Sequence, residues 1–224
     1  HTGSYPRLTE LIKEISKNPN LERIRISSIE ITELDDKFME ELRVNKKICN
    51  HLHIPLQAGS NEILKRMNRK YDLSYFFDKI KEIRELRPNI SITTDVIVGF
   101  PGETKELFEE TIKTCRDLEF AKIHVFPYSE RQGTKAMELP NHVDPSEKKR
   151  RARELLLVSK ELEIAYANKF VNKQEEVLIE EEKDGYSYGH TSNYLHVKIP
   201  KSIEHNTFVT VTITKVDYPY CLAK

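Results

Sequence analysis

The segment 51–60 combines residue types that bind polar ligands. It ends in Gln57, Gly59 and Ser60, which follow a run of mostly apolar residues. An amide and a hydroxyl can form hydrogen bonds with a ligand, and a glycine lets the backbone come close to it. Ser60 is also suited to cap a helix that begins at Asn61. These two roles of Ser60 are compatible.

His51 and His53 stand two residues apart in the same segment. On a strand this spacing places both rings on one face, so a metal pair is conceivable. No third ligand is apparent in the sequence. Ordinary hydrogen-bonded histidines are therefore the favoured interpretation.

The segment 94–104 joins an apolar run to a helical pattern through a turn with two glycines. Gly99 and Gly102 would let backbone amides approach a nucleotide or nucleoside. The alternative is an ordinary strand-to-helix turn with Glu103 at the helix N-terminus, where a carboxylate is favourable. The segment is not a P-loop, because no Gly-Lys-Ser/Thr follows at the required spacing. Taken alone, it favours the ordinary turn.

Two more polar segments follow apolar runs. Arg131 comes just after 122–128, where its guanidinium could bind a carboxylate or phosphate in a bidentate manner or form a surface salt bridge. Ser28 and Glu30 follow 23–27 and could reach a ribose or cap the next turn. Only the combination of these segments predicts a specific site.

Two features could contact nucleic acid. Within 146–173, eight basic residues stand against four acidic ones, and Lys148 and Arg151 could belong to a phosphate-contacting stripe or to a solvated helix face. In 189–196, exposed His190, Asn193 and Tyr194 could stack on or hydrogen-bond to unpaired bases. The second feature is the more informative, because charge runs are usually solvated.

These segments need strands and helices to position them. Apolar runs of strand length cover 23–27, 51–56, 92–98 and 122–128. Amphipathic helical patterns cover 8–16, 36–43, 61–67, 73–86 and 103–118. This alternation predicts parallel strands with helical crossovers, in a doubly wound sheet or part of a β/α barrel. Such folds bind ligands at the carboxyl ends of their strands, where the polar segments lie.

The last third of the chain has a different pattern. Pro145 opens a long charged helix with an apolar stripe, and the pattern then changes to period two in 177–180 and 209–214. Asp184-Gly185 is a hairpin signal between two strands. We therefore expect two domains, 1–168 and 169–224, the second an antiparallel sheet or small barrel. Residues 1–4 resemble the loop that leaves a strand not present in this chain.

Composition narrows the class of protein. Lys plus Arg and Asp plus Glu both number 36, so global charge gives no argument for nucleic-acid binding. No apolar run approaches the roughly 20 residues that span a bilayer, and no signal peptide is evident, which predicts a soluble cytoplasmic protein. Cys49, Cys115 and Cys221 form no cluster and are expected to be small buried hydrophobic residues.

Three motifs in register carry a resemblance to a known family. HIPLQAGSNEILKRMNRKY, TTDVIVGFPGET and KIHVFPYSERQGTKA each lie at one strand end, in an order that resembles the radical S-adenosylmethionine (SAM) methylthiotransferases. RIRISSIEI resembles the preceding barrel strand, and the segment from about Lys169 resembles the RNA-binding TRAM domain. The likeness covers essentially the whole chain. It implies an α/β fold: a partial, TIM-like radical SAM β/α barrel, then a small OB-like antiparallel β-barrel.

The resemblance also implies an activity. GHTSNYLHVKIP is most similar to the branch that adds a methylthio group to C2 of N6-threonylcarbamoyladenosine at position 37 of tRNA. The alternatives are the branches acting on isopentenyladenosine or a ribosomal protein, a non-catalytic tRNA-binding module, or another radical SAM enzyme such as a relative of porphyrinogen oxidase.

The family's cofactors would be SAM and two 4Fe-4S clusters, whose ligands are absent from this sequence; we expect no metal ligand here and no activity of the isolated chain. The resemblance places the following residues at SAM: Ser28, Glu30, Gln57, Ser60, Val98, Gly99, Gly102, Phe126, Tyr128, Ser129 and Arg131. The expected partners are SAM and tRNA, and no association with a membrane is expected.

Overall fold

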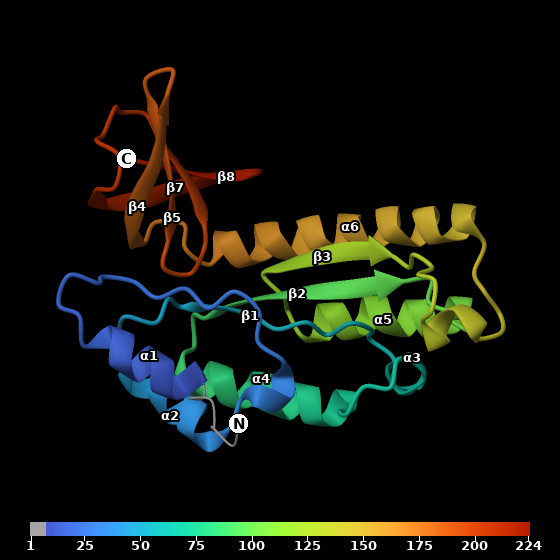
Figure 1. Cartoon of the computed structure of the whole chain (residues 1–224). Helices are drawn as coiled ribbons and strands as arrows, with labels where there is room; N and C mark the ends of the chain where they lie inside the picture. Colours follow the sequence, from blue (N-terminus) through green and yellow to red (C-terminus); the bar gives the residue numbers. More distant parts are fainter. Residues whose placement is uncertain (1–7) are drawn as a thin grey trace.

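The computed structural model describes residues 8–224, and it contains two regions built on separate hydrophobic cores (Figure 1). The prediction for residues 1–4 falls outside the described residues. Among residues 8–224, no helix is long and apolar enough to cross a membrane.

A three-stranded parallel sheet forms the centre of the first region, in the order β1-β2-β3. Its strands are β1 (His51–His53), β2 (Ser91–Val98) and β3 (Lys122–Pro127). Helices precede, connect and follow the strands, as parallel pairing requires: α1 (Leu8–Ser16), η1 (Ile31–Glu33), α2 (Asp36–Val44), α3 (Asn61–Arg66), α4 (Leu73–Leu86), α5 (Lys105–Asp117), η2 (Lys135–Glu138) and α6 (Pro145–Asn168). The predicted alternation of strands and helices is confirmed for the strands predicted at 51–56, 92–98 and 122–128.

Short polar side chains start several of these helices. Asp35, Asp72 and Thr104 accept a hydrogen bond from a backbone N–H of the first turn of α2, α4 and α5. Ser60 stands at the same position before α3, but its side chain makes no capping bond. Its buried hydroxyl has no hydrogen-bond partner, so the predicted cap is wrong.

The predicted strand 23–27 is absent. Its backbone is paired mainly by an isolated parallel bridge between Ile24 and Ile48. Arg23 and Arg25 instead direct their side chains to backbone carbonyls of the second region. The arginines of this alternating segment therefore contact the second region, and the segment does not form a regular strand at the edge of the sheet.

The second region is a closed five-stranded barrel in the order β4-β5-β6-β8-β7. Its strands are β4 (Gln174–Lys183), β5 (Tyr186–Thr191), β6 (His196–Ile199), β7 (Phe208–Asp217) and β8 (Tyr220–Ala223). Asp184 and Gly185 form the predicted hairpin turn, with φ of 53° and 78°. The β6–β8 pair is parallel, which differs from the expected antiparallel barrel. An odd number of strands cannot alternate in direction around a closed ring, so one parallel pair is required.

The long helix α6 joins the two regions. Leu155 and Val158 belong to the core of the first region, and Tyr166 and Ala167 to the core of the second. Figure 1 shows α6 running along β3 and ending beneath the barrel. The apolar stripe predicted for this helix therefore packs against both cores.

Candidate active-site cleft and nucleic-acid interface

A cleft of about 480 Å³ lies at the carboxyl ends of β2 and β3, within the size range of small-molecule sites. We call it the strand-end cleft. Five of the residues predicted to bind SAM line it: Gln57, Phe126, Tyr128, Ser129 and Arg131. The remaining lining residues are Asp95, Ile97, Pro127, Thr134 and Ala136. The structure thus brings together side chains from three segments that are far apart in the sequence.

Among the residues of this cleft that sequence reasoning missed are the two on β2, Asp95 and Ile97. Along β2, Thr94, Val96 and Val98 are fully buried, whereas Asp95 and Ile97 between them are only partly buried. Alternation along a strand places these two sets on opposite faces. The available signal was the one charged side chain of this strand, because a buried carboxylate is costly unless its face of the strand is polar.

The glycine turn after β2 is held by protein contacts. Gly99 and Gly102 have φ of 73° and 86°, a region that favours glycine. A Cβ on Gly99 would lie 2.5 Å from Cγ of Lys148, and the backbone N–H of Gly99 donates to Glu103 at 2.6 Å. Neither glycine nor Val98 lines the strand-end cleft. Their contact with SAM stays a prediction, and packing alone accounts for the glycines.

Lys148 and Arg151 do not form a phosphate-contacting stripe, so this prediction is wrong. Both residues are buried. Arg151 donates to Glu103 at 2.7 Å and to Glu147 at 2.8 Å, and Nζ of Lys148 lies 5.0 Å from the ring centroid of Tyr128. Burial raises the pKa of Glu103, while Arg151 and the amide of Gly99 oppose the shift. Lys148 and Arg151 therefore lie on the inner face of α6 and pack this helix against the glycine turn.

Ser28, Glu30 and Ser60 lie outside the strand-end cleft. Ser28 and Glu30 line a separate hollow beside α1 and η1, and Glu30 accepts a hydrogen bond from Arg69 at 3.1 Å. Ser60 is fully buried. The structure therefore does not bring these predicted residues together with the other five.

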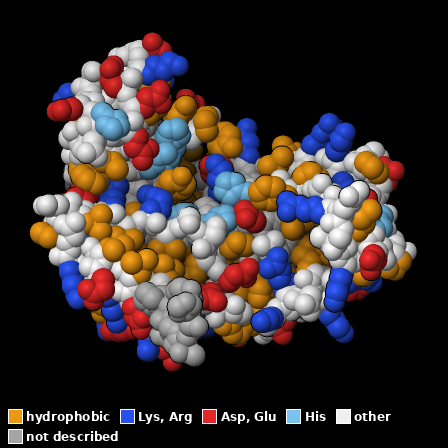
Figure 2. Space-filling model, viewed as in Figure 1, with side chains coloured by type: hydrophobic (Ala, Val, Ile, Leu, Met, Phe, Trp, Pro, Cys, Tyr) orange, Lys and Arg blue, Asp and Glu red, His pale blue; other side chains and the backbone are white. Residues whose placement is uncertain are grey.

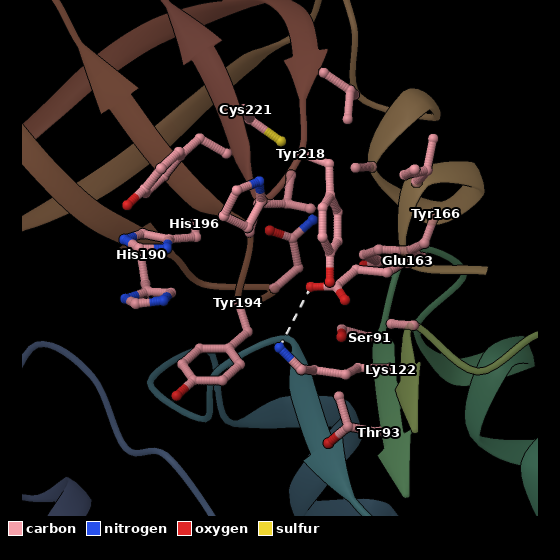
Figure 3. A pocket seen from close by; sticks show the side chains of 18 of the residues that line it. Ser91, Thr93, Lys122, Glu163, Tyr166, His190, Tyr194, His196, Tyr218 and Cys221 are labelled. Carbon is pink, nitrogen blue, oxygen red and sulfur yellow. Dashed lines mark hydrogen bonds and ion pairs between the residues drawn. The ribbon is translucent and has the colours of Figure 1, made fainter. Parts of the chain in front are cut away.

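A second cavity, which we call the domain-junction pocket, lies between the sheet and the barrel (Figure 3). Thr93, Lys122 and His124 contribute from the sheet, and Glu163 and Tyr166 from α6. The barrel contributes His190, Asn193, Tyr194, Leu195, His196 and Tyr220 among others. Figure 2 shows histidine side chains gathered in the hollow between the two regions.

Aromatic rings form a column along the barrel side of this pocket. Tyr194 stacks on His190, and His190 on His196, each with ring centroids 4.6 Å apart. Tyr220 continues the column at 4.6 Å and Tyr188 at 5.4 Å. Burial lowers the pKa of His196 from its ordinary value. Stacked aromatic rings are a surface on which a nucleobase can stack.

The three predicted base-contacting residues have different positions. Tyr194 is 45 % exposed and His190 is partly buried, so both can meet a ligand. Asn193 was expected to be exposed but is buried, with its side-chain oxygen accepting a hydrogen bond from Thr191. The side chain of Asn193 therefore stabilises the loop that follows Thr191. Arg25, which the sequence did not indicate, stands 4.3 Å from the ring centroid of Tyr194.

Direct hydrogen bonds hold the two regions together beside this pocket. Arg23 donates to the carbonyl of His190 at 3.2 Å and to the carboxylate of Glu176 at 2.8 Å. The backbone N–H of Asn50 donates to the hydroxyl of Ser192 at 2.9 Å. The side chain of Arg23 is 15 % exposed and that of Glu176 is 60 % exposed, so only the cation of this ion pair is shielded from solvent.

The favoured interpretation of the histidine pair is confirmed. His51 and His53 contact the same hydroxyl, Oγ1 of Thr93, at 3.0 and 2.9 Å. Within residues 8–224, no group of three or more His, Cys, Asp or Glu side chains is arranged to hold a metal ion. The three cysteines are free and buried as expected, and burial raises the pKa of the Cys115 thiol to about 12.

Comparison with known proteins gives consistent results. The family model of the Radical SAM superfamily matches residues 1–115. The chain is 40 % identical, over 98 % of its length, to the threonylcarbamoyladenosine tRNA methylthiotransferase MtaB of Bacillus subtilis, of which it covers 52 %. It is 41 % identical, over 82 % of its length, to the tRNA-2-methylthio-N(6)-dimethylallyladenosine synthase of Endomicrobium trichonymphae, of which it covers 44 %.

The chain therefore spans about half the length of the curated relatives it matches. A solved structure, coproporphyrinogen III oxidase (HemN) from Escherichia coli, shares the fold with a TM-score of 0.58 at 18 % identity, covering 87 % of this chain and 51 % of that one. The match to the family model extends over half of the sequence and includes β1 and β2, which position the strand-end cleft. The chain belongs to the Radical SAM superfamily.

Proposed function

We propose that this chain forms one wall of the SAM-binding cleft and the tRNA-binding domain of a radical SAM methylthiotransferase. In this proposal, the complete enzyme adds a methylthio group to C2 of N6-threonylcarbamoyladenosine at position 37 of tRNA, in the cytoplasm. Residues 1–168 would be the partial barrel and 169–224 a TRAM-like RNA-binding domain. The observation that carries the proposal is the placement of the strand-end cleft on the same face of the sheet as the pocket lined by the aromatic column, in a chain similar over 98 % of its length to a tRNA methylthiotransferase.

The residues of the strand-end cleft fit SAM. Ile97 and the ring of Phe126, which is 50 % exposed, offer an apolar wall for an adenine. Gln57 and Asp95 offer hydrogen-bonding groups for a ribose or an amino group, and Arg131 can bind a carboxylate. Bound SAM would supply the methyl group and the radical chemistry of the family. The chain's own residues would orient it and shield the reacting atoms from water.

The described residues do not fit a 4Fe-4S cluster. The cysteines of this chain are buried separately, and no metal-binding group occurs in residues 8–224. We therefore propose that ligands for both clusters lie outside this part of the protein, and that the isolated chain binds its substrates without turning them over.

The domain-junction pocket would bind the RNA. Tyr194 and His190 present ring faces to an unpaired base, and Arg25 adds a positive charge at the same ring. The strand-end cleft and this pocket both open along the inner face of the sheet, since Thr93 lines one and Asp95 the other. A tRNA loop held at the barrel would thus deliver a neighbouring nucleoside to the cleft.

The main alternative is the branch that acts on dimethylallyladenosine. It is favoured by the relative of that name from Endomicrobium trichonymphae, at 41 % identity. That relative aligns with 82 % of the chain and the threonylcarbamoyladenosine enzyme with 98 %, which supports the first assignment.

Mass spectrometry of tRNA nucleosides tests the proposal in an organism that carries the gene. Deletion should abolish 2-methylthio-N6-threonylcarbamoyladenosine and leave its unmethylthiolated precursor. Loss of the methylthiolated dimethylallyl nucleoside instead would assign the alternative branch. An unchanged nucleoside profile would overturn both.

A further inference from the structure

Lys122 and Glu163 form an ion pair inside the domain-junction pocket for which the proposed function gives no role. Lys122 begins β3, and Glu163 lies on α6. Figure 3 shows their side chains directed at one another within the pocket. Nζ of Lys122 lies 3.4 Å from Oε1 of Glu163, and the two side chains are 44 % and 25 % exposed. Both charges are therefore partly shielded from solvent yet open to a ligand.

This ion pair leaves hydrogen-bonding capacity for a ligand. Its distance of 3.4 Å is longer than the roughly 2.7–2.9 Å of a strong charge-assisted hydrogen bond. An ammonium carries three N–H donors, and within residues 8–224 Glu163 is the one group with which Lys122 pairs. A ligand can therefore bind the ammonium through an anion and the carboxylate through an O–H or N–H group.

Lys122 is the only lysine or arginine among the residues that line this pocket, all of which lie in the described part of the chain. His124 and His196 also line it, but burial lowers the pKa of both rings, which disfavours their charged forms. Ser91 and Tyr166 add hydroxyl groups. The pocket therefore suits a hydrophilic group that carries an anion together with hydrogen-bond donors.

The sheet places this pocket next to the strand-end cleft. Along β2, Thr93 lines the pocket and Asp95 lines the cleft. Along β3, His124 lines the pocket and Phe126 lines the cleft. Residues two apart on one strand share a face and lie about 7 Å apart. In an adenine, C2 and the N6 substituent stand on either side of N1. One nucleoside can therefore present C2 to the cleft while its N6 substituent enters the pocket.

We propose that Lys122 is a specificity-determining residue that binds the carboxylate of the threonylcarbamoyl group on N6 of the target adenosine. Glu163 accepts a hydrogen bond from the hydroxyl or an N–H of the same group. At about 260 Å³ the pocket lies below the usual range for a whole small molecule, which suits a substituent. The inference rests on the proposed function, because it names the group that distinguishes threonylcarbamoyladenosine from dimethylallyladenosine as the substrate.

A dimethylallyl group would fit this pocket poorly. It carries neither a charge nor a hydrogen-bond donor, so it would displace water from Lys122 and Glu163 without replacing the lost hydrogen bonds. Sites built to bond a polar group discriminate strongly against an analogue that lacks it. The ion pair therefore selects the threonylcarbamoyl nucleoside and disfavours the dimethylallyl one.

Fluorescence anisotropy with three anticodon stem-loop RNAs tests this assignment. The RNAs differ only at position 37, which is adenosine, N6-threonylcarbamoyladenosine or N6-dimethylallyladenosine. The wild-type chain should bind the threonylcarbamoyl RNA about tenfold more tightly than either of the others, as expected for a hydrogen bond to a charged group. Equal affinities for the three RNAs, or a preference for the dimethylallyl RNA, would overturn the inference.

Substitutions at Lys122 test whether this residue causes the preference. Lys122→Met should bind the three RNAs with equal affinity, whereas Lys122→Arg should retain most of the preference because it keeps the cation. Lys113→Met, on the exposed face of α5, removes a lysine that also pairs with a carboxylate and should leave the preference unchanged. If Lys122→Met weakened all three RNAs by the same factor, Lys122 would contact the RNA backbone or only support the fold, and the inference would be wrong. A Lys122→Met variant with unchanged affinities would contradict it equally.

The failure of this inference is distinguishable from the failure of the proposed function. If the wild-type chain binds none of the three RNAs, the tRNA-binding role fails, and the inference fails with it. If the wild type binds all three RNAs with equal affinity, the tRNA-binding role stands and only the specificity assigned to Lys122 fails.

Discussion

The strand-end cleft and the domain-junction pocket lie on the same inner face of the sheet but are built differently. The cleft uses residues at and after the ends of β2 and β3, and the buried pair of Arg151 and Glu103, which does not line it, holds the adjacent glycine turn. The junction pocket uses residues from the sheet, α6 and the barrel, which also hold the two regions together. Ligand binding and stability should therefore be separable at the cleft and more closely coupled at the junction.

The largest effect is expected behind the cleft, at Arg151. Arg151→Met should lower the free energy of unfolding by about 3–5 kcal/mol, because it leaves the fully buried carboxylate of Glu103 without its charged partner. Urea unfolding monitored by circular dichroism measures the loss. The matched control is Arg150→Met on the exposed face of α6, where ion pairs contribute about 0–1 kcal/mol. Equal effects of the two variants would show that the buried pair does not fasten the turn.

A smaller effect should distinguish the two sites by ligand. Tyr194→Ala should weaken binding of a stem-loop RNA by about 1–3 kcal/mol, the usual contribution of one stacked base. It should leave SAM affinity unchanged, because Tyr194 does not line the strand-end cleft. Fluorescence anisotropy and isothermal titration measure the two affinities.

Phe126→Ala is the reciprocal variant at the cleft. It should weaken SAM binding and change stability little, since half of this ring is already exposed. Tyr186→Ala, at the barrel's hairpin, controls for the loss of an exposed aromatic ring and should change neither affinity. If Tyr194→Ala and Phe126→Ala weakened both ligands alike, the two cavities would be one site.

The cleft was more predictable from the sequence than the junction. Polar residues after β3, such as Arg131, can be assigned from local patterns, because parallel strands bring their carboxyl ends to one edge. Asp95 was missed because a strand pattern alone does not say which face is buried. Lys148 and Arg151 were misassigned because charge counting ignores which helix face packs inward.

The junction depends on contacts between distant residues. Arg25 and Tyr194 lie 169 positions apart in the sequence, and no local pattern pairs them. The failure of the predicted strand 23–27 has a similar cause. Only an isolated bridge forms there, and the arginine side chains of this segment bond to the second region, which no local pattern indicates. Sequence reasoning therefore identified ring-bearing residues of the barrel but not the pocket that they form with the sheet.

The coupling of the junction to stability should appear as a pH dependence through His51. Its ring stands 4.8 Å from that of Tyr194, and its pKa of about 3 in the folded protein is below the ordinary value of 6.5. The unfolded chain therefore binds the proton that the folded one excludes, so stability is lost as the pH falls below about 6.5 toward 3. This group alone should make the protein about 1–2 kcal/mol less stable at pH 5 than at pH 7.

Urea unfolding at the two pH values measures this difference. His51→Gln removes the titrating ring, so it should reduce the loss between pH 7 and pH 5 by that amount, whatever its effect at pH 7. His205→Gln, at an exposed position before β7, should keep the full loss. An unchanged loss in His51→Gln would mean that the ring is open to protonation in the folded protein. In that case, the shielding of the junction, which distinguishes it from the open strand-end cleft, would be absent in solution.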